Sequence, residues 1–127
     1  VPLSRQALAV LEKLRAYSGG NQYVFPSYRS ETIPFGRTAL QRAIRRMGFE
    51  KDEMCPHGFR AMASTLLNEL GYNRDWIERQ LAHAPTEQIR GIYNRAEYLS
   101  ERRRMLQNWA DYLDGLRAKA RQEVDLE

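Results

Sequence analysis

The chain has only two histidines, and each lies near residues that can take part in phosphate chemistry. His57 is followed three residues later by Arg60 at the predicted start of a helix, so the imidazole and the guanidinium share one helix face. A helix N-terminus adds unbonded backbone N–H groups and a positive potential, both of which favour an anion. The pair therefore predicts a phosphate-binding site, although a His-x-x-Arg pair also arises by chance.

The second histidine, His83, follows a short predicted helix, and Tyr93 lies ten residues beyond it, on or beside the next helix. A connection of this length can fold His83 back toward Tyr93 and Arg60, although spacing alone does not establish that the three residues converge. Each residue also has a structural explanation. A histidine at a helix end can bind the terminal carbonyls, and a tyrosine more often packs in the core or lies at the surface.

The order and spacing of three segments resemble the signature of the tyrosine recombinases, the family of the phage integrases. The segments are Pro-His-Gly-Phe-Arg-Ala at 56–61, Leu-Ala-His at 81–83 and Ile-Tyr-Asn-Arg at 92–95. The family shows His-x-x-Arg, then Leu-Gly-His or a close variant, then a tyrosine about ten residues further on. Here Ala82 replaces the usual glycine. Segments 63–68, 77–83 and 93–98 are most similar to the P4-type integrases, and the resemblance covers roughly residues 1–115.

The resemblance implies that Tyr93 attacks the scissile phosphodiester and forms a 3′-phosphotyrosine bond, which releases a 5′-hydroxyl strand. Arg60 would bind a non-bridging oxygen of that phosphate, His57 would accept or relay the tyrosine proton, and His83 would hydrogen-bond the phosphoryl group. No metal or other cofactor is implied. The implied activity is site-specific DNA recombination in phage or genomic-island integration and excision. Tyr98 is a competing nucleophile that the family spacing disfavours.

Two catalytic groups of the family have no counterpart in this sequence. The resemblance places the first catalytic arginine in an earlier helix, and the general-acid lysine on a β-hairpin that should end just before Val1. Lys13 and Lys51 do not lie in the matching context. We therefore expect a single, truncated catalytic domain over residues 1–127, from which most of the family's small sheet is missing. We also expect that this piece cleaves DNA poorly or not at all when it is separated from the rest.

Helical periodicity dominates the chain and predicts a mainly α fold, the helical C-terminal part of the family's catalytic domain. Cap residues and glycines mark the helix ends. Residues 21–36, interrupted by proline and glycine, predict a loop with a strand turn. The predicted helices run from Ser4 to Gly19-Gly20, from about Thr38 to Gly48, from near His57 to Gly71, from Asn73 to Leu81, from Thr86 past Tyr93, and over residues 100–119.

The spacing of apolar residues predicts which helix faces pack. In the last helix, Met105, Trp109, Tyr112 and Leu116 form a seam, which packs against the protein's own core or docks onto a neighbouring protomer. In the other helices the predicted apolar faces are Leu8, Leu11 and Leu14; Leu40, Ala43, Ile44 and Met47; Phe59, Ala63, Leu66, Leu67 and Leu70; and Trp76, Ile77 and Leu81.

All but three of the 20 basic residues are arginine, and the formal net charge is +4. Arginine matches phosphate oxygens with a planar fork of donors, although a solvated surface is the simpler explanation of this composition. Arg42, Arg45 and Arg46 share a face of the second helix and are candidates for contacts with the DNA backbone. The implied partners are double-stranded DNA attachment sites, other integrase protomers, and an excisionase or a host DNA-bending protein.

The single cysteine, Cys55, excludes an internal disulfide, and widely spaced His and Cys residues do not predict a zinc site. The single cysteine fits a reducing compartment, and no apolar run is long enough to span a bilayer. The resemblance implies a bacterial cytoplasmic protein that is associated with the nucleoid. Two alternatives remain at this point. One is a non-catalytic helical module for DNA binding or assembly. The other is a relative of the type IB topoisomerases, which the P4-like segments disfavour.

Overall fold

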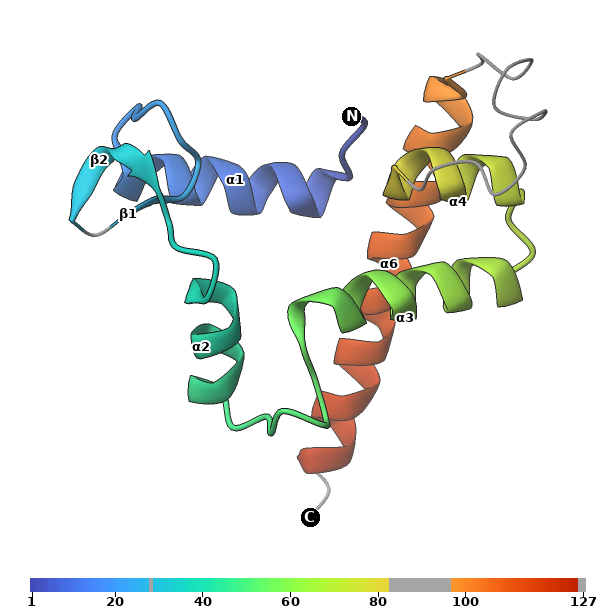
Figure 1. Cartoon of the computed structure of the whole chain (residues 1–127). Helices are drawn as coiled ribbons and strands as arrows, with labels where there is room; N and C mark the ends of the chain where they lie inside the picture. Colours follow the sequence, from blue (N-terminus) through green and yellow to red (C-terminus); the bar gives the residue numbers. More distant parts are fainter. Residues whose placement is uncertain (28, 83–96, 126–127) are drawn as a thin grey trace. The chain divides into compact units, whose positions relative to one another are not determined.

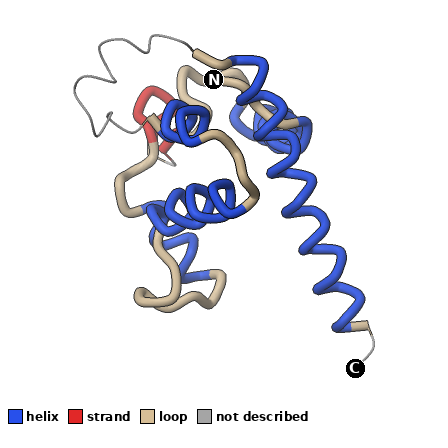
Figure 2. The backbone as a smooth tube through the Cα atoms, turned by 90° about the vertical axis from the view of Figure 1, so that its right-hand side faces the viewer, coloured by secondary structure: helices blue, strands red, loops and turns tan. Residues whose placement is uncertain are grey.

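The computed structural model describes residues 1–27, 29–82 and 97–125. Helices dominate the described chain, with one short strand pair, so the predicted mainly α class is confirmed (Figures 1 and 2). The helix predicted from Thr86 falls outside the described residues. The elements are α1 (Arg5–Ser18), β1 (Pro26–Ser27), β2 (Ser30–Pro34), α2 (Ala39–Arg46), α3 (Pro56–Glu69), α4 (Arg74–Leu81) and α6 (Leu99–Val124).

The chain divides into two compact units. One unit comprises Val1–Leu8 and Leu66–Glu127, and the other comprises Ala9–Thr65. Two helices therefore pass from one unit to the other: α1 after its first four residues, and α3 at Leu66. The unit boundaries fall inside α1 and α3, and helical periodicity in the sequence predicts both of these helices.

In the unit of residues 9–65, glycines and a small hairpin follow α1. Gly19 and Gly20 have φ values of +60° and +83°, the left-handed region that ends a helix cheaply when no Cβ is present. β1 and β2 then pair as antiparallel strands, and the pairing register shifts between Pro26 and Ser27 of β1. The rings of Phe25 and Phe35 meet edge to face with centroids 5.5 Å apart, just outside the strand pair. The strand turn predicted for residues 21–36 is thus present.

Helix α2 presents a narrower packed face than its apolar spacing predicts. Ile44 is buried, whereas Leu40 and Met47, predicted on the same face, are 50% and 64% exposed. The helix has eight residues, about two turns, so one buried side chain is what a short contact can cover. Gly48, with φ +97°, ends the helix where the sequence predicts.

The core of the other unit joins three helices. Leu67 of α3, Ile77 of α4 and Met105 of α6 are almost fully buried, and α4 lies against α6 (Figure 1). The inward-facing positions predicted for α4 are confirmed, because Trp76 and Leu81 pack on this core beside Ile77. Tyr72 and Trp109 also pack on it.

The stripe predicted along α3 is wrong at both ends. Phe59 and Leu70 are 47% and 49% exposed. Phe59 lies in the part of α3 that belongs to the unit of residues 9–65. Leu70 directly precedes Gly71, where the chain leaves the helix.

The turn between α3 and α4 follows from two residue types. Gly71 has φ +80°, and the N–H of Tyr72 donates to the Leu67 carbonyl at 3.1 Å, which is the Schellman arrangement for a helix end. Asn73 then caps α4, and its side-chain oxygen accepts from the Asp75 N–H at 2.8 Å. Both the stop at Gly71 and the cap at Asn73 confirm the sequence prediction.

The first turn of α1 is tied to the middle of α6. Gln6 Nε2 donates to Asp111 Oδ1 at 2.8 Å and to Asp114 Oδ2 at 2.9 Å. Gln107 Nε2 donates to Gln6 Oε1 and to Asp111 Oδ1, and the Arg5 N–H donates to Gln107 Oε1. These bonds cross about a hundred residues of sequence, so they belong to tertiary structure that local patterns do not predict. They hold the chain's first residues in the unit built around α6.

Candidate active site

Helix α3 begins with the predicted phosphate-binding pair. Pro56 occupies the first helical position, where a missing N–H costs nothing and a fixed φ suits the helix. His57 and Arg60 follow within the first two turns, and both side chains are exposed to solvent. An imidazole and a guanidinium, three residues apart at a helix N-terminus, can bind a phosphate that approaches from solvent.

The loop before α3 is fixed by Arg45 of α2. Its Nη1 donates to the carbonyl oxygens of Phe49, Glu50 and Met54 at 2.6, 2.8 and 3.0 Å, and Nη2 donates to Met54 at 3.0 Å. Hydrogen bonds from a charged donor are stronger than neutral ones. Arg45 therefore holds the chain two residues before Pro56, where α3 begins.

This arrangement separates the three arginines predicted to contact the DNA backbone. Arg42 and Arg46 are exposed, whereas Arg45 is half-buried and uses its guanidinium on carbonyls of its own chain. Donors that are already bonded to three carbonyls are poorly placed to bind phosphate as well. Arg45 was predicted because helical spacing puts it beside Arg42 and Arg46, but spacing does not show where the following loop returns.

Met54 also packs against the glycine inside the His-x-x-Arg segment. A Cβ added at Gly58 would lie 3.1 Å from Met54 Sδ, closer than an ordinary contact. The Gly58 N–H donates to the Cys55 carbonyl at 2.9 Å, which closes the first turn around the same residues. Glycine between His57 and Phe59 therefore gives the Met54 side chain the space that it occupies.

His83 and Tyr93, the other two predicted catalytic residues, lie outside the described residues. The structure describes the residues on either side. Ala82 has φ 50° and ψ 38°, and Tyr98 has φ 48° and ψ 41°, both in the left-handed region that disfavours a side chain. The conformation of Ala82 gives a physical reason for the glycine that the recombinase signature usually has at this position.

Sequence reasoning missed a buried arginine beside this segment. Arg102 of α6 is 6% exposed. Its Nε and Nη2 donate to Gln80 Oε1 at 3.1 and 2.9 Å, and its Nη1 donates to the Glu97 carbonyl at 2.9 Å. A signal was present in the sequence, because Arg102 precedes Met105 and Trp109 by three and seven residues and so falls on their helix face.

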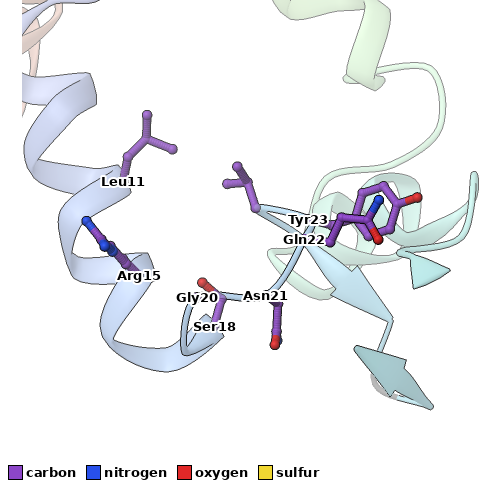
Figure 3. A pocket seen from close by; sticks show the side chains of 8 residues that line it. Leu11, Arg15, Ser18, Gly20, Asn21, Gln22 and Tyr23 are labelled. Atoms are coloured by element: carbon purple, nitrogen blue, oxygen red, sulfur yellow. The ribbon is translucent and has the colours of Figure 1, made fainter. Parts of the chain in front are cut away.

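An open pocket of about 300 Å³ lies between the end of α1 and the loop that follows it (Figure 3). Leu11 and Arg15 contribute from the helix, and residues 20–24 contribute from the loop. Among the described residues that line it, neither His57 nor Arg60 is present. Within the described ranges no three His, Cys, Asp or Glu side chains gather as metal ligands, and no helix has both the length and the apolar character to cross a bilayer.

Comparison of the sequence with known proteins identifies a family to which it is similar. The model of the phage integrase family matches residues 1–99, which include all four predicted catalytic residues. The integrase of Enterobacteria phage P4 is 44% identical over 94% of this chain, and the prophage integrase IntZ of Escherichia coli K12 is 46% identical over 93%. The integrase of Shigella phage Sf6 is 41% identical over 90%. No solved structure gives a significant match.

The match has a clear extent. The chain covers 28%, 29% and 30% of the lengths of these three relatives, so it corresponds to less than a third of each. Within that part, the similarity extends over nearly all of the chain rather than over a short motif. A family match across most of the sequence and relatives above 40% identity together show that the chain belongs to the phage integrase family, as a P4-type tyrosine recombinase.

Proposed function

We propose that this chain supplies the tyrosine-bearing part of an integrase active site, which cuts and rejoins double-stranded DNA at attachment sites. The observation that carries the proposal is the family match over residues 1–99. The position of His57 and Arg60 at the exposed start of α3 supports it, because a DNA phosphate can reach both side chains from solvent. Tyr93 is the proposed nucleophile.

The proposed reaction is a reversible phosphoryl transfer. His57 accepts the Tyr93 proton while the phenol oxygen bonds to phosphorus. The bond from phosphorus to the 5′ oxygen breaks, and the family's general-acid lysine, which the resemblance places before Val1, donates a proton to that oxygen. The products are a 3′-phosphotyrosyl strand and a strand with a 5′-hydroxyl. Arg60 and His83 stabilise the charge on the non-bridging oxygens as it develops. Rejoining runs the same steps backward with a 5′-hydroxyl of another strand, so the protein–DNA bond retains the energy for ligation.

The proposed DNA contacts outside the reacting phosphate come from exposed arginines of α2. Arg42 and Arg46 offer donors to the DNA backbone, which provides affinity without sequence choice. Exchange of strands needs several active sites, so the proposed partners are other integrase protomers, with an excisionase or a host DNA-bending protein controlling direction. Part of the seam predicted on α6 packs in its own core at Met105 and Trp109, while Leu116 is 44% exposed.

The proposal is tested by trapping the covalent intermediate. An intact integrase of the relatives' length that carries this chain should form a covalent adduct with a nicked attachment-site duplex, which blocks rejoining. Tyr93→Phe should abolish the adduct and leave DNA affinity unchanged, because it removes one hydroxyl oxygen and little else. Tyr98→Phe is the matched control and should retain the adduct. An adduct that survives Tyr93→Phe and disappears with Tyr98→Phe reassigns the nucleophile.

The 127 residues by themselves should trap little or no adduct. The family's first catalytic arginine and its general-acid lysine have no counterpart in this sequence, and losing groups that act together on one transition state costs many powers of ten in rate. Efficient trapping by the 127-residue chain would refute this part of the proposal. Absence of any adduct from the intact protein would instead favour the second candidate, a non-catalytic DNA-binding module.

A further inference from the structure

Three consecutive arginines, Arg102 to Arg104, lie near the start of α6, and they differ in burial. Arg102 is 6% exposed, whereas Arg103 and Arg104 are exposed. Consecutive residues of a helix lie about 100° apart around its axis, so only one of three neighbours can face the core squarely. Arg102 is the one that shares the face of Met105. The chain therefore contains its own matched controls for this buried side chain.

Burying a guanidinium is costly unless its N–H groups are hydrogen-bonded. Arg102 meets this requirement through Gln80 Oε1, which accepts from Nε and Nη2, and through the Glu97 carbonyl, which accepts from Nη1. Its own backbone N–H donates to the Tyr98 carbonyl at 2.8 Å. All of these groups belong to one compact unit of the chain.

The two acceptors of the guanidinium stand on either side of the segment that carries His83 and Tyr93. Gln80 lies in the last turn of α4, two residues before Ala82, and Glu97 is the first described residue after position 96. One planar group thus holds two points of the chain that are seventeen positions apart in sequence. Backbone bonds of a helix or a turn span three or four residues and cannot hold such points together.

We propose that Arg102 is a positioning residue for strand cleavage, which fixes the points where the segment with His83 and Tyr93 leaves α4 and enters α6. This inference rests on the proposed function. A nucleophile must approach phosphorus within a narrow range of distance and angle, and a displacement of about 1 Å can lower the rate on the order of a hundredfold. Arg102 would act through Gln80 and Glu97, which flank this segment, without contacting DNA.

The test compares variants of the intact integrase in single-turnover adduct formation, with DNA affinity and folded fraction measured beside the rate. Arg102→Met keeps most of the side-chain volume and removes the donors. At a temperature where the variant is folded, the adduct rate should fall on the order of a hundredfold while DNA affinity stays within about twofold of wild type. Arg103→Met should keep the wild-type adduct rate.

A second pair of variants keeps the inference testable if Arg102→Met does not fold. Gln80→Leu removes the acceptor at similar size and should slow adduct formation, whereas Gln80→Glu retains an acceptor oxygen and should keep most of the rate. The inference is overturned if Arg102→Met or Gln80→Leu, when folded, forms adduct at the wild-type rate. It is also overturned if Gln80→Glu loses as much as Gln80→Leu. An inactive wild-type protein would count against the proposed function instead.

Discussion

At the scale of single residues, arginine has two uses in this chain. Arg45 and Arg102 bind carbonyl and amide oxygens of their own chain, while Arg42 and Arg46 are exposed. The guanidinium suits the first use because its several donors lie in one plane and reach separate acceptors at once. A count of arginines therefore overstates the charge that is available to DNA.

The left-handed conformation of Ala82 leads to a stability prediction. Ala82→Gly should raise the free energy of unfolding by about 1 kcal/mol, because glycine adopts this φ without the Cβ clash. Equilibrium unfolding in urea measures the change. Ala118→Gly, at an exposed position inside α6, is the matched control and should lower the free energy of unfolding by about 1 kcal/mol. If both variants shift in the same direction, the strain at Ala82 is not the cause.

The sequence predicts some of these residue roles and not others. The helix start that carries His57 and Arg60 is confirmed, because α3 begins at Pro56, while the catalytic roles of these two residues stay predictions. The role of Arg102 was detectable, since a charge on an apolar stripe needs an internal partner. The role of Arg45 was not, because its acceptors belong to a loop whose path depends on tertiary packing.

At the scale of elements, α2 and the loop after it determine how α3 begins. Eight residues of helix carry one buried side chain, Ile44, so apolar packing gives this region little stability. The four hydrogen bonds from Arg45 to the carbonyls of Phe49, Glu50 and Met54 add to the backbone hydrogen bonds within this loop. The start of the proposed catalytic helix thus depends on polar contacts more than on a core.

Substitution of Arg45 should consequently affect the free energy of unfolding much more than substitution of Arg46. Arg45→Ala should lower the free energy of unfolding by about 1.5 kcal/mol, because charged hydrogen bonds to carbonyls are lost. Arg46→Ala should change it by less than about 0.5 kcal/mol. Denaturant unfolding measures both values.

In DNA binding, Arg46→Ala should have the larger effect of the two variants. In salt titrations of duplex affinity, Arg46→Ala should reduce the slope of log K against log salt concentration by about 1, since one phosphate contact is removed. Arg45→Ala should leave the slope unchanged. An unchanged slope for Arg46→Ala, with or without Arg42→Ala, would return α2 to the role of a solvated face.

Element boundaries were predicted best where a cap or a glycine defines them. Gly48, Gly71 and Asn73 end or begin helices as expected, since positive φ and side-chain capping are local properties. The last helix is longer than residues 100–119, because Arg121–Val124 includes neither glycine nor proline to end it. Exposure of Leu40 and Phe59 could not be predicted, because helical spacing defines a face but not whether another element covers it.

At the scale of the whole molecule, distant parts of the sequence meet through polar side chains of α6. Asp111 accepts from Gln6 and from Gln107, and Arg5 lies 3.8 Å from its Oδ1. The hydrogen bond from Gln6, then that from Gln107, and the charge of Arg5 lower the pKa of the Asp111 carboxyl below its usual range. The first turn of α1 is attached to α6 through a group that titrates.

This attachment should weaken in acid. Because the folded-state pKa of Asp111 is lowered, its contribution to stability is present above the unfolded pKa of about 4 and is lost as pH falls through the folded value. Asp111→Asn should therefore be less stable than wild type at pH 7, and the gap should narrow below about pH 4. Urea unfolding across this range measures the gap.

The exposed thiol of Cys55 has a practical consequence. It is the only cysteine of the chain and lies two residues before His57, at the start of α3. A maleimide dye would attach at one place, next to the proposed phosphate site, without any engineered cysteine. Its fluorescence would report the arrival of a duplex in real time, and alkylation with a bulky reagent would act as a chemical block at the entrance to that site.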